Sequence, residues 1–177
     1  MIPWSERRFQ YTSKQPALYA TATLRGPRRT EENVQAWACL DYGRGLWPYG
    51  TTWNWASAAG VQGVHPVGLQ FGGKWTDGTG MTENALFVAG KIHKIGDTID
   101  FAYDHRDFLK PWTLRSERVD LAFSPFMQNA VRIPLGVVSL DAHVCFGRFF
   151  GRVQMDGGDW LAVTSLLGWA EEFRTRW

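Results

Sequence analysis

Three charged side chains stand where the surrounding sequence is apolar. Asp41 closes one apolar run, Glu83 precedes another, and Arg148 lies between Phe146 and Phe150. A buried charge is costly unless it is paired, so such residues either pair with each other or serve a site. The structural interpretation is an ion pair between Arg148 and Asp41 or Glu83. The functional interpretation is a carboxylic acid whose pKa is raised by burial.

A buried acid of this kind could protonate a double bond or an epoxide in a dry pocket. That is the chemistry of a hydratase, isomerase or cyclase working without a cofactor. Asp41 or Glu83 would be the acid, and Arg148 would orient the substrate or stabilise a nearby anion. Other catalytic patterns are missing: the sequence has no nucleophile elbow, no phosphate loop and no dinucleotide fingerprint opening a helix.

Metal chemistry has little support in the sequence. Four histidines are scattered along the chain: His65, His93, His105 and His143. None has a partner at metal-ligand spacing, so no metal site is predicted. His143 lies in an apolar run, where it is either a satisfied core histidine or a residue that faces a ligand. Cys39 and Cys145 give no disulfide framework and are expected to be free thiols.

Aromatic residues are abundant, with ten Trp, eleven Phe and five Tyr among 177 residues. They either fill the core of a β-protein or line a ligand cavity, which is typically apolar with a few placed polar groups. Trp53 and Trp55 share one strand face and Asn54 takes the other. An outward-facing tryptophan pair would instead mark a partner surface. The predicted ligand-binding residues are Trp37, Trp53, Asn54, Trp55, His143 and Phe149.

The elements that must position these residues are predicted to be strands. Apolar and polar residues alternate over 18–24, 98–103 and 119–123, between Gly-rich and Pro-rich turns. Ala89-Gly90 is predicted to be a hairpin turn, and 34–42 a strand buried on both faces. Residues 166–177 suit either a short helix or a strand. About ten strands and little helix indicate an all-β antiparallel barrel or strongly curved sandwich, in one domain over 1–177.

Composition excludes several partners. The formal net charge of +2 is too balanced for a phosphate-neutralising surface, so nucleic acid is not an expected partner. No apolar stretch approaches the roughly 18 residues of a membrane span. The chain turns polar at Ser5, without the apolar segment of a secretory signal, so a cytoplasmic location is expected.

Several sequence blocks resemble a bacterial family, domain of unknown function 2804 (DUF2804). The blocks are residues 37–49 (WACLDYGRGLWPY), 53–57 (WNWAS), 73–80 (GKWTDGTG), 82–85 (TENA), 93–94 (HK) and 168–172 (GWAEE). The resemblance implies a calycin-type, lipocalin-like barrel, similar to the paired barrels of carotenoid hydratase and related cyclase proteins. In such pairs an apolar ligand lies in or between the barrels. Family members are usually about twice as long, and this chain resembles their C-terminal half.

Three functions remain open on these observations. The first is binding of an apolar small molecule, such as a lipid or terpenoid, in an aromatic-lined barrel. The second is the cofactor-independent enzyme described above. The third is an interaction scaffold, which would form a homodimer or dock to a second barrel. The direction in which the carboxylates point would discriminate the first two, because an unpaired carboxylate in a cavity favours catalysis.

Overall fold

The computed structural model describes residues 1–177 and contains twelve strands and no helix. The all-β prediction is confirmed, with two strands more than the ten expected. The ambiguous segment 166–177 lies almost entirely in a strand, β12 (Trp160–Arg176). Ala89 and Gly90 form the predicted hairpin turn, both with positive φ, as the commonest two-residue hairpin turn requires. No helix long and apolar enough to cross a membrane is found.

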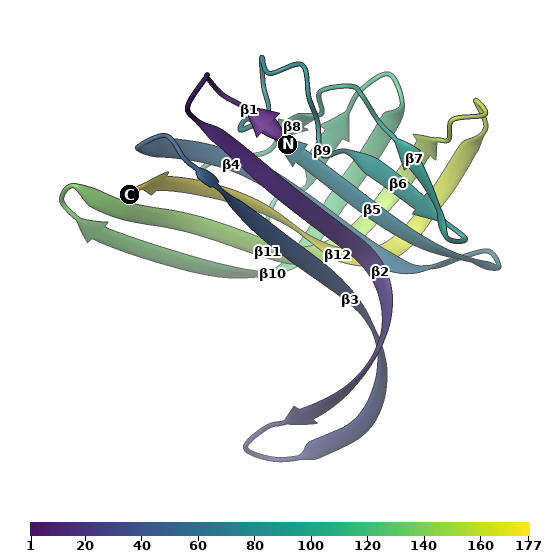
Figure 1. Ribbon diagram of the computed structural model, residues 1–177. Helices are drawn as coiled ribbons and strands as arrows, with labels where there is room; N and C mark the ends of the chain where they lie inside the picture. The colour runs from purple at the N-terminus through teal and green to yellow at the C-terminus, as the bar shows by residue number, and fades with distance from the viewer.

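Nine antiparallel strands form the main sheet, which curls into a half-barrel (Figure 1). In spatial order they are β7 (Lys91–Lys94), β6 (Ala85–Val88), β5 (His65–Gly73), β4 (Gly50–Gln62), β12, β11 (Val138–Gln154), β10 (Val119–Leu135), β9 (Trp112–Arg115) and β8 (Asp100–Ala102). The edge strands β7 and β8 do not pair, so the barrel is open. Arg118 links the two halves at one end, because it donates to the carbonyl oxygens of Lys94 and Gln154, each at 2.9 Å.

The inner face of the main sheet is the face that carries Ala56 and Ala58, and it is filled by a core of 21 buried residues. Its largest fully buried side chains are Trp112, Phe71, Phe123 and Phe149, and the rings of Phe123 and Phe149 lie 4.6 Å apart. None of these core residues lines any of the four main cavities. The half-barrel interior is therefore packed with side chains, and the four main cavities lie outside this core.

The outer face of the main sheet, which carries Trp53 and Trp55, is crossed by a long hairpin (Figure 1). This hairpin consists of β2 (Phe9–Arg25) and β3 (Thr30–Leu46), with the two-residue strand β1 (Ile2–Pro3) paired to β2. It passes close to β5 at Gly68, where an added Cβ would lie 2.9 Å from the Cβ of Ala17. Beyond this crossing the hairpin projects away from the sheet.

The prediction that residues 34–42 are buried on both faces is wrong. Side chains of β3 in this range are half-buried or exposed, and Leu40 and Tyr42 are both more than half exposed. The physical reason is the position of the hairpin: near the crossing one of its faces meets the main sheet and the other meets solvent, and beyond the crossing the hairpin projects away from the sheet. An apolar run is therefore not sufficient to place a strand between two layers.

Candidate functional site

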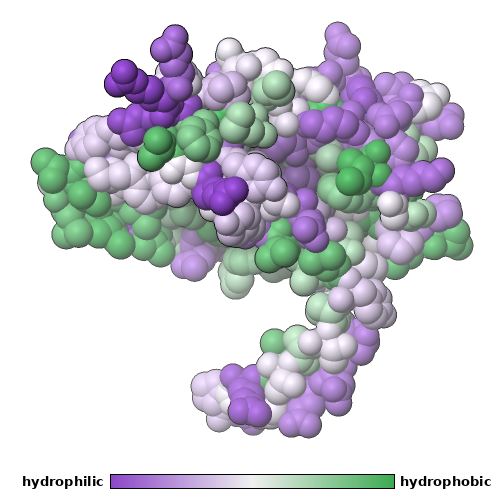
Figure 2. All heavy atoms as spheres, viewed as in Figure 1, coloured by the Kyte–Doolittle hydropathy of each residue, from purple (hydrophilic) through white to green (hydrophobic).

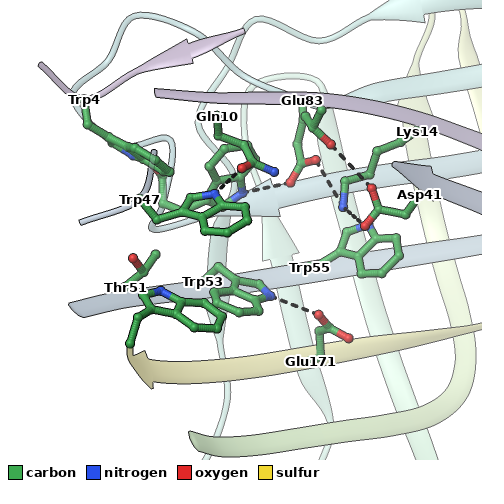
Figure 3. A pocket seen from close by; sticks show the side chains of 13 residues that line it. Trp4, Gln10, Lys14, Asp41, Trp47, Thr51, Trp53, Trp55, Glu83 and Glu171 are labelled. Carbon is green, nitrogen blue, oxygen red and sulfur yellow. Dashed lines mark hydrogen bonds and ion pairs between the residues drawn. The ribbon is translucent and has the colours of Figure 1, made fainter. Parts of the chain in front are cut away.

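A pocket of about 240 Å³ lies between the outer face of the main sheet and the β2–β3 hairpin (Figure 3). Six of its thirteen lining residues are tryptophans: Trp4, Trp47, Trp53, Trp55, Trp75 and Trp177. The others are polar or charged: Gln10, Thr12, Lys14, Asp41, Thr51, Glu83 and Glu171. The pocket thus combines residues from both ends of the chain, and we call it the tryptophan pocket.

Strand alternation on β4 and β12 builds the floor of the tryptophan pocket. Trp53 and Trp55 point to the outer face because Asn54 and Ala56, between and beside them, are buried on the inner face. Phe173 lies directly opposite Trp53, and the two rings stack with centroids 4.8 Å apart. The two strands therefore present aromatic rings to the hairpin above, with Glu171 opposite Trp55.

The indole nitrogens hold the polar groups in place. Trp53 Nε1 donates to Glu171 Oε1 at 3.0 Å, and Trp75 Nε1 donates to Glu83 Oε1 at 2.9 Å. Trp55 Nε1 donates to Gln70 Oε1 at 2.9 Å. With these N–H groups satisfied, the apolar ring surfaces that line the pocket can contact an apolar ligand, although one face of Trp53 is stacked on Phe173 and Lys14 lies over the Trp55 ring.

Lys14 supplies the ammonium group of the pocket, which pairs with two of its three carboxylates. Lys14 Nζ lies 3.0 Å from Asp41 Oδ2 and 3.5 Å from Glu83 Oε2. The same nitrogen lies 3.7 Å from the ring centroid of Trp55, which is a cation–π contact. Glu171 has no cation within ion-pair distance. With all groups ionised, three carboxylates and one ammonium leave the lining negatively charged.

Burial raises the pKa of the Glu171 carboxyl to about 7. The hydrogen bond from Trp53 and the charge of Lys14 lower this pKa only in part, and the charges of Asp41 and Glu83 raise it further. Burial also raises the pKa of Glu83, against the effects of Lys14 and Trp75. The pocket therefore contains a carboxyl group that is close to half protonated at neutral pH.

Glu83 sits in a place shaped for it by β5 and the segment before β6. Gly72 leaves room for the carboxyl group, because an added Cβ would overlap Glu83 Oε1. The next residue, Asn84, accepts a hydrogen bond from the Gly72 N–H at 2.7 Å and donates to the carbonyl oxygen of Asp97 at 2.8 Å. Glu83 Oε2 is buried and makes no hydrogen bond, since the 3.5 Å distance to Lys14 is an ion-pair contact only.

Four of the predicted site residues come together in the tryptophan pocket: Asp41, Glu83, Trp53 and Trp55. Arg148 does not join them. It is exposed and donates to the carbonyl oxygen of Ser165 at 2.9 Å, so the predicted pairing of Arg148 with a carboxylate is wrong. Lys14 is the cation that takes this role.

The other predicted ligand-binding residues lie outside the pocket. Phe149 is in the inner core, and Asn54, also on the inner face, donates to Tyr103 Oη at 3.0 Å. The His143 ring stacks on Phe108 with centroids 4.0 Å apart. Trp37 lies on the hairpin, edge-on to Tyr19. Asn54 is separated from Trp53 and Trp55 because adjacent positions on a strand face opposite sides of the sheet.

Sequence reasoning missed two charged residues of the site, Lys14 and Glu171. Lys14 stands between Ser13 and Gln15, in a polar segment typical of an exposed strand. Glu171 carried a usable signal, because it alternates with Trp169 and Phe173 as a residue of one strand face would. That signal was obscured because the same segment also suited a helix.

Another buried carboxylate, Glu172, lies on the inner face and is surrounded by donors. Lys74 Nζ lies 2.6 Å from its Oε2 and Arg174 Nη2 lies 2.8 Å from its Oε1, while Tyr103 Oη donates to Oε2. Burial alone would raise the pKa of Glu172, but these hydrogen bonds and positive charges hold it below its usual value. Elsewhere too, no three His, Cys, Asp or Glu side chains are arranged to hold a metal ion.

The fold and the pocket define an all-β protein with a curled, half-barrel antiparallel sheet and a crossing hairpin. The chain belongs to the family described as Domain of unknown function (DUF2804), whose model matches residues 1–177. The resemblance seen in the sequence blocks is confirmed, and the curled sheet is compatible with the calycin-like architecture it implied. No curated protein and no solved structure gives a significant match to the chain.

Proposed function

We propose that this protein binds a small, largely apolar molecule in the tryptophan pocket. The observation that carries the proposal is the lining of the pocket. Six indole rings surround the cavity, and its charged groups are three carboxylates and Lys14. Ligand sites are typically apolar cavities of this kind, of about 300–1,000 Å³. At about 240 Å³ the pocket suits a compact ligand, or one end of a longer lipid or terpenoid.

Titration with short-chain alcohols and monoterpene alcohols, followed by tryptophan fluorescence, tests this proposal. We expect saturable quenching that is lost in Trp53→Ala. Trp160→Ala is the control, because Trp160 is exposed at the far end of β12 and does not line the pocket. Quenching that persists in Trp53→Ala, or no saturable response to any member of the set, would reject the proposal.

An acid-catalysed reaction is the second candidate function, and the raised pKa of Glu171 favours it. Its protonated carboxyl could give a proton to a substrate double bond or epoxide, as expected for a cofactor-independent hydratase, isomerase or cyclase. Glu83, also of raised pKa, is the second candidate acid, whereas Asp41 is held by Lys14. Turnover of an added alkene or epoxide that is abolished in Glu171→Gln would establish this function.

A partner surface is the third candidate, favoured by exposed apolar side chains at the end of the β10–β11 hairpin. Figure 2 shows these apolar residues gathered there. The most exposed are Leu135 and Val137, and they would contact a second copy of the chain or a second barrel. Sedimentation equilibrium tests this: a dimer that dissociates in Leu135→Asp supports the surface, and a monomer at all concentrations rejects it.

The state of the two cysteines is relevant to the cellular compartment of the protein. Cys39 and Cys145 are both free thiols. Unpaired cysteines are typical of reducing compartments, which supports the proposal that the protein is cytoplasmic.

A further inference from the structure

The tryptophan pocket is a place where an ammonium group is already stabilised. Lys14 Nζ contacts the Trp55 ring and lies within ion-pair distance of two carboxylates, Asp41 and Glu83. Aromatic faces combined with carboxylates are the environment that binds protonated amines in proteins. The lining therefore has the chemistry of an amine site, and the chain's own lysine fills one part of it.

The rest of the lining has polar oxygens that lack a hydrogen-bond donor or a cation partner. Glu171 uses Oε1 for Trp53 and has no ion-pair partner. The Glu83 side chain is 4% exposed, points into the pocket, and leaves Oε2 without a hydrogen bond (Figure 3). Thr51 Oγ1, also in the lining, is buried without a hydrogen-bond partner. Buried polar atoms are rarely left unsatisfied, so unpaired acceptors in a cavity indicate a missing donor.

We propose that the ligand of the tryptophan pocket carries a protonated primary amine, which binds between Glu171 and Glu83 while its apolar body contacts the indole rings. This inference rests on the proposed binding function and names the class of its ligand. A primary ammonium has three N–H donors for the unpaired oxygens, whereas a quaternary ammonium has the charge but no donor. A neutral alcohol offers one donor and no charge.

Isothermal titration calorimetry with four hexyl compounds separates these possibilities. The probes are hexylamine, hexan-1-ol, hexanoate and hexyltrimethylammonium, which have the same chain and different head groups. At pH 8, where Glu171 is ionised, we expect hexylamine to bind at least about tenfold more tightly than hexanol. Hexyltrimethylammonium should bind several-fold more weakly than hexylamine, because it cannot donate to the unpaired oxygens.

The preference for the amine should fall as the pH is lowered from 8 to 5.5. Hexylamine stays protonated over this range, while Glu171 takes up a proton as the pH passes about 7. The charged groups that face Glu171 are Lys14 on β2, Asp41 on β3 and Glu83 before β6. The pKa of Glu83 is also raised, so protonation of Glu83 on acidification would weaken amine binding in the same direction.

Glu171→Gln should abolish most of the tenfold preference, mainly by weakening the binding of hexylamine. The glutamine side chain has the same shape and its oxygen can still accept from Trp53. Glu117→Gln is the charge-matched control, since Glu117 is exposed and lies outside the pocket. Glu83→Gln provides a second variant with the same expected direction.

The possible results distinguish the inference from the function on which it rests. Equal binding of hexanol and hexylamine would keep the proposed function and overturn the amine assignment. Tightest binding of hexanoate would also overturn it, because Lys14 would then be the anchor. Equal binding of hexylamine and hexyltrimethylammonium would overturn the primary amine as the specific head group. Absence of binding by all four compounds would reject both the inference and the proposed function.

Discussion

Glu171 and Glu172 are consecutive residues of β12, yet they occupy opposite faces of the sheet and opposite electrostatic environments. Both are buried, with exposed fractions of 7% and 2%. Glu171 faces the tryptophan pocket with one indole N–H and no cation at ion-pair distance. Glu172 faces inward, in contact with Lys74 and Arg174. The pKa of the first carboxyl is raised and that of the second is lowered.

This difference shows that burial alone does not determine whether a carboxyl group is protonated. The desolvation of both groups favours the neutral acid, and the partners decide whether that tendency is overcome. Glu172 is a satisfied structural anion, whereas Glu171 is an incompletely paired group in a cavity. Incomplete pairing of this kind is more typical of binding and catalytic sites.

Replacing Glu172 should have the largest effect on stability. Glu172→Gln removes the anion that Lys74, Tyr103, Arg174 and His105 face, and should lower the free energy of unfolding by about 3–5 kcal/mol at pH 7. Because the pKa of Glu172 is lowered, its contribution is present above the usual glutamate pKa and is lost as the pH falls through the folded-state value. Urea unfolding at several pH values would show a deficit that shrinks in acid. A deficit independent of pH would contradict this account.

Glu171→Gln should change stability in the opposite direction and raise the free energy of unfolding at pH 8. Between the usual glutamate pKa of 4.5 and about 7, the folded protein retains a proton that the unfolded chain has lost. The wild-type protein therefore loses stability as the pH rises through this window, by an amount on the order of 3 kcal/mol. The variant lacks this loss, so it should be more stable than wild type at pH 8 and equal to it near pH 4. Destabilisation at pH 8 would mean that Glu171 has a cation partner.

A glycine on the pocket side of β5 should give an intermediate effect. Gly72→Ala places a Cβ against the Glu83 carboxyl group and should cost about 1–3 kcal/mol. Gly96→Ala is the control, because nothing lies within 4 Å of an added Cβ there. The displaced Glu83 should also release Trp75 Nε1, which would alter tryptophan fluorescence. Equal stability of the two variants would show that Glu83 moves aside freely.

The smallest effect is expected at Arg148. Its hydrogen bonds to Ser165 are solvent-exposed and it has no carboxylate partner, so Arg148→Met should change stability by about 0.5 kcal/mol or less. Thermal unfolding of the two proteins would measure this. A loss of several kcal/mol would contradict this account and would support the buried ion pair that the sequence first suggested.

The sequence predicted the local features of the fold and fewer of the contacts between elements. Period-two alternation identified the strands and put Trp53 and Trp55 on one face, and glycine identified the Ala89-Gly90 turn. The pocket, however, depends on where the β2–β3 hairpin crosses the sheet, and no local pattern contains that information. Asp41 is the direct partner of Lys14 across the β2–β3 hairpin, but Glu83 approaches Lys14 only through the crossing, so the role of Lys14 in the pocket was missed.

The C-terminal strand β12 lies at the centre of the main sheet, with four strands on either side. Its neighbour β4 is made more than a hundred residues earlier, so Trp53 must wait for Phe173 before the two rings can stack. During synthesis, β4–β7 and β8–β11 form the two sides of the main sheet, and β12 cannot join them until residues 160–176 leave the ribosome. Pairing across such sequence distances is slow, in the range of milliseconds to seconds for β-proteins. Folding of the tryptophan pocket is therefore a late event, and the edges of β4 and β11 stay open to chaperones or to aggregation until β12 is inserted.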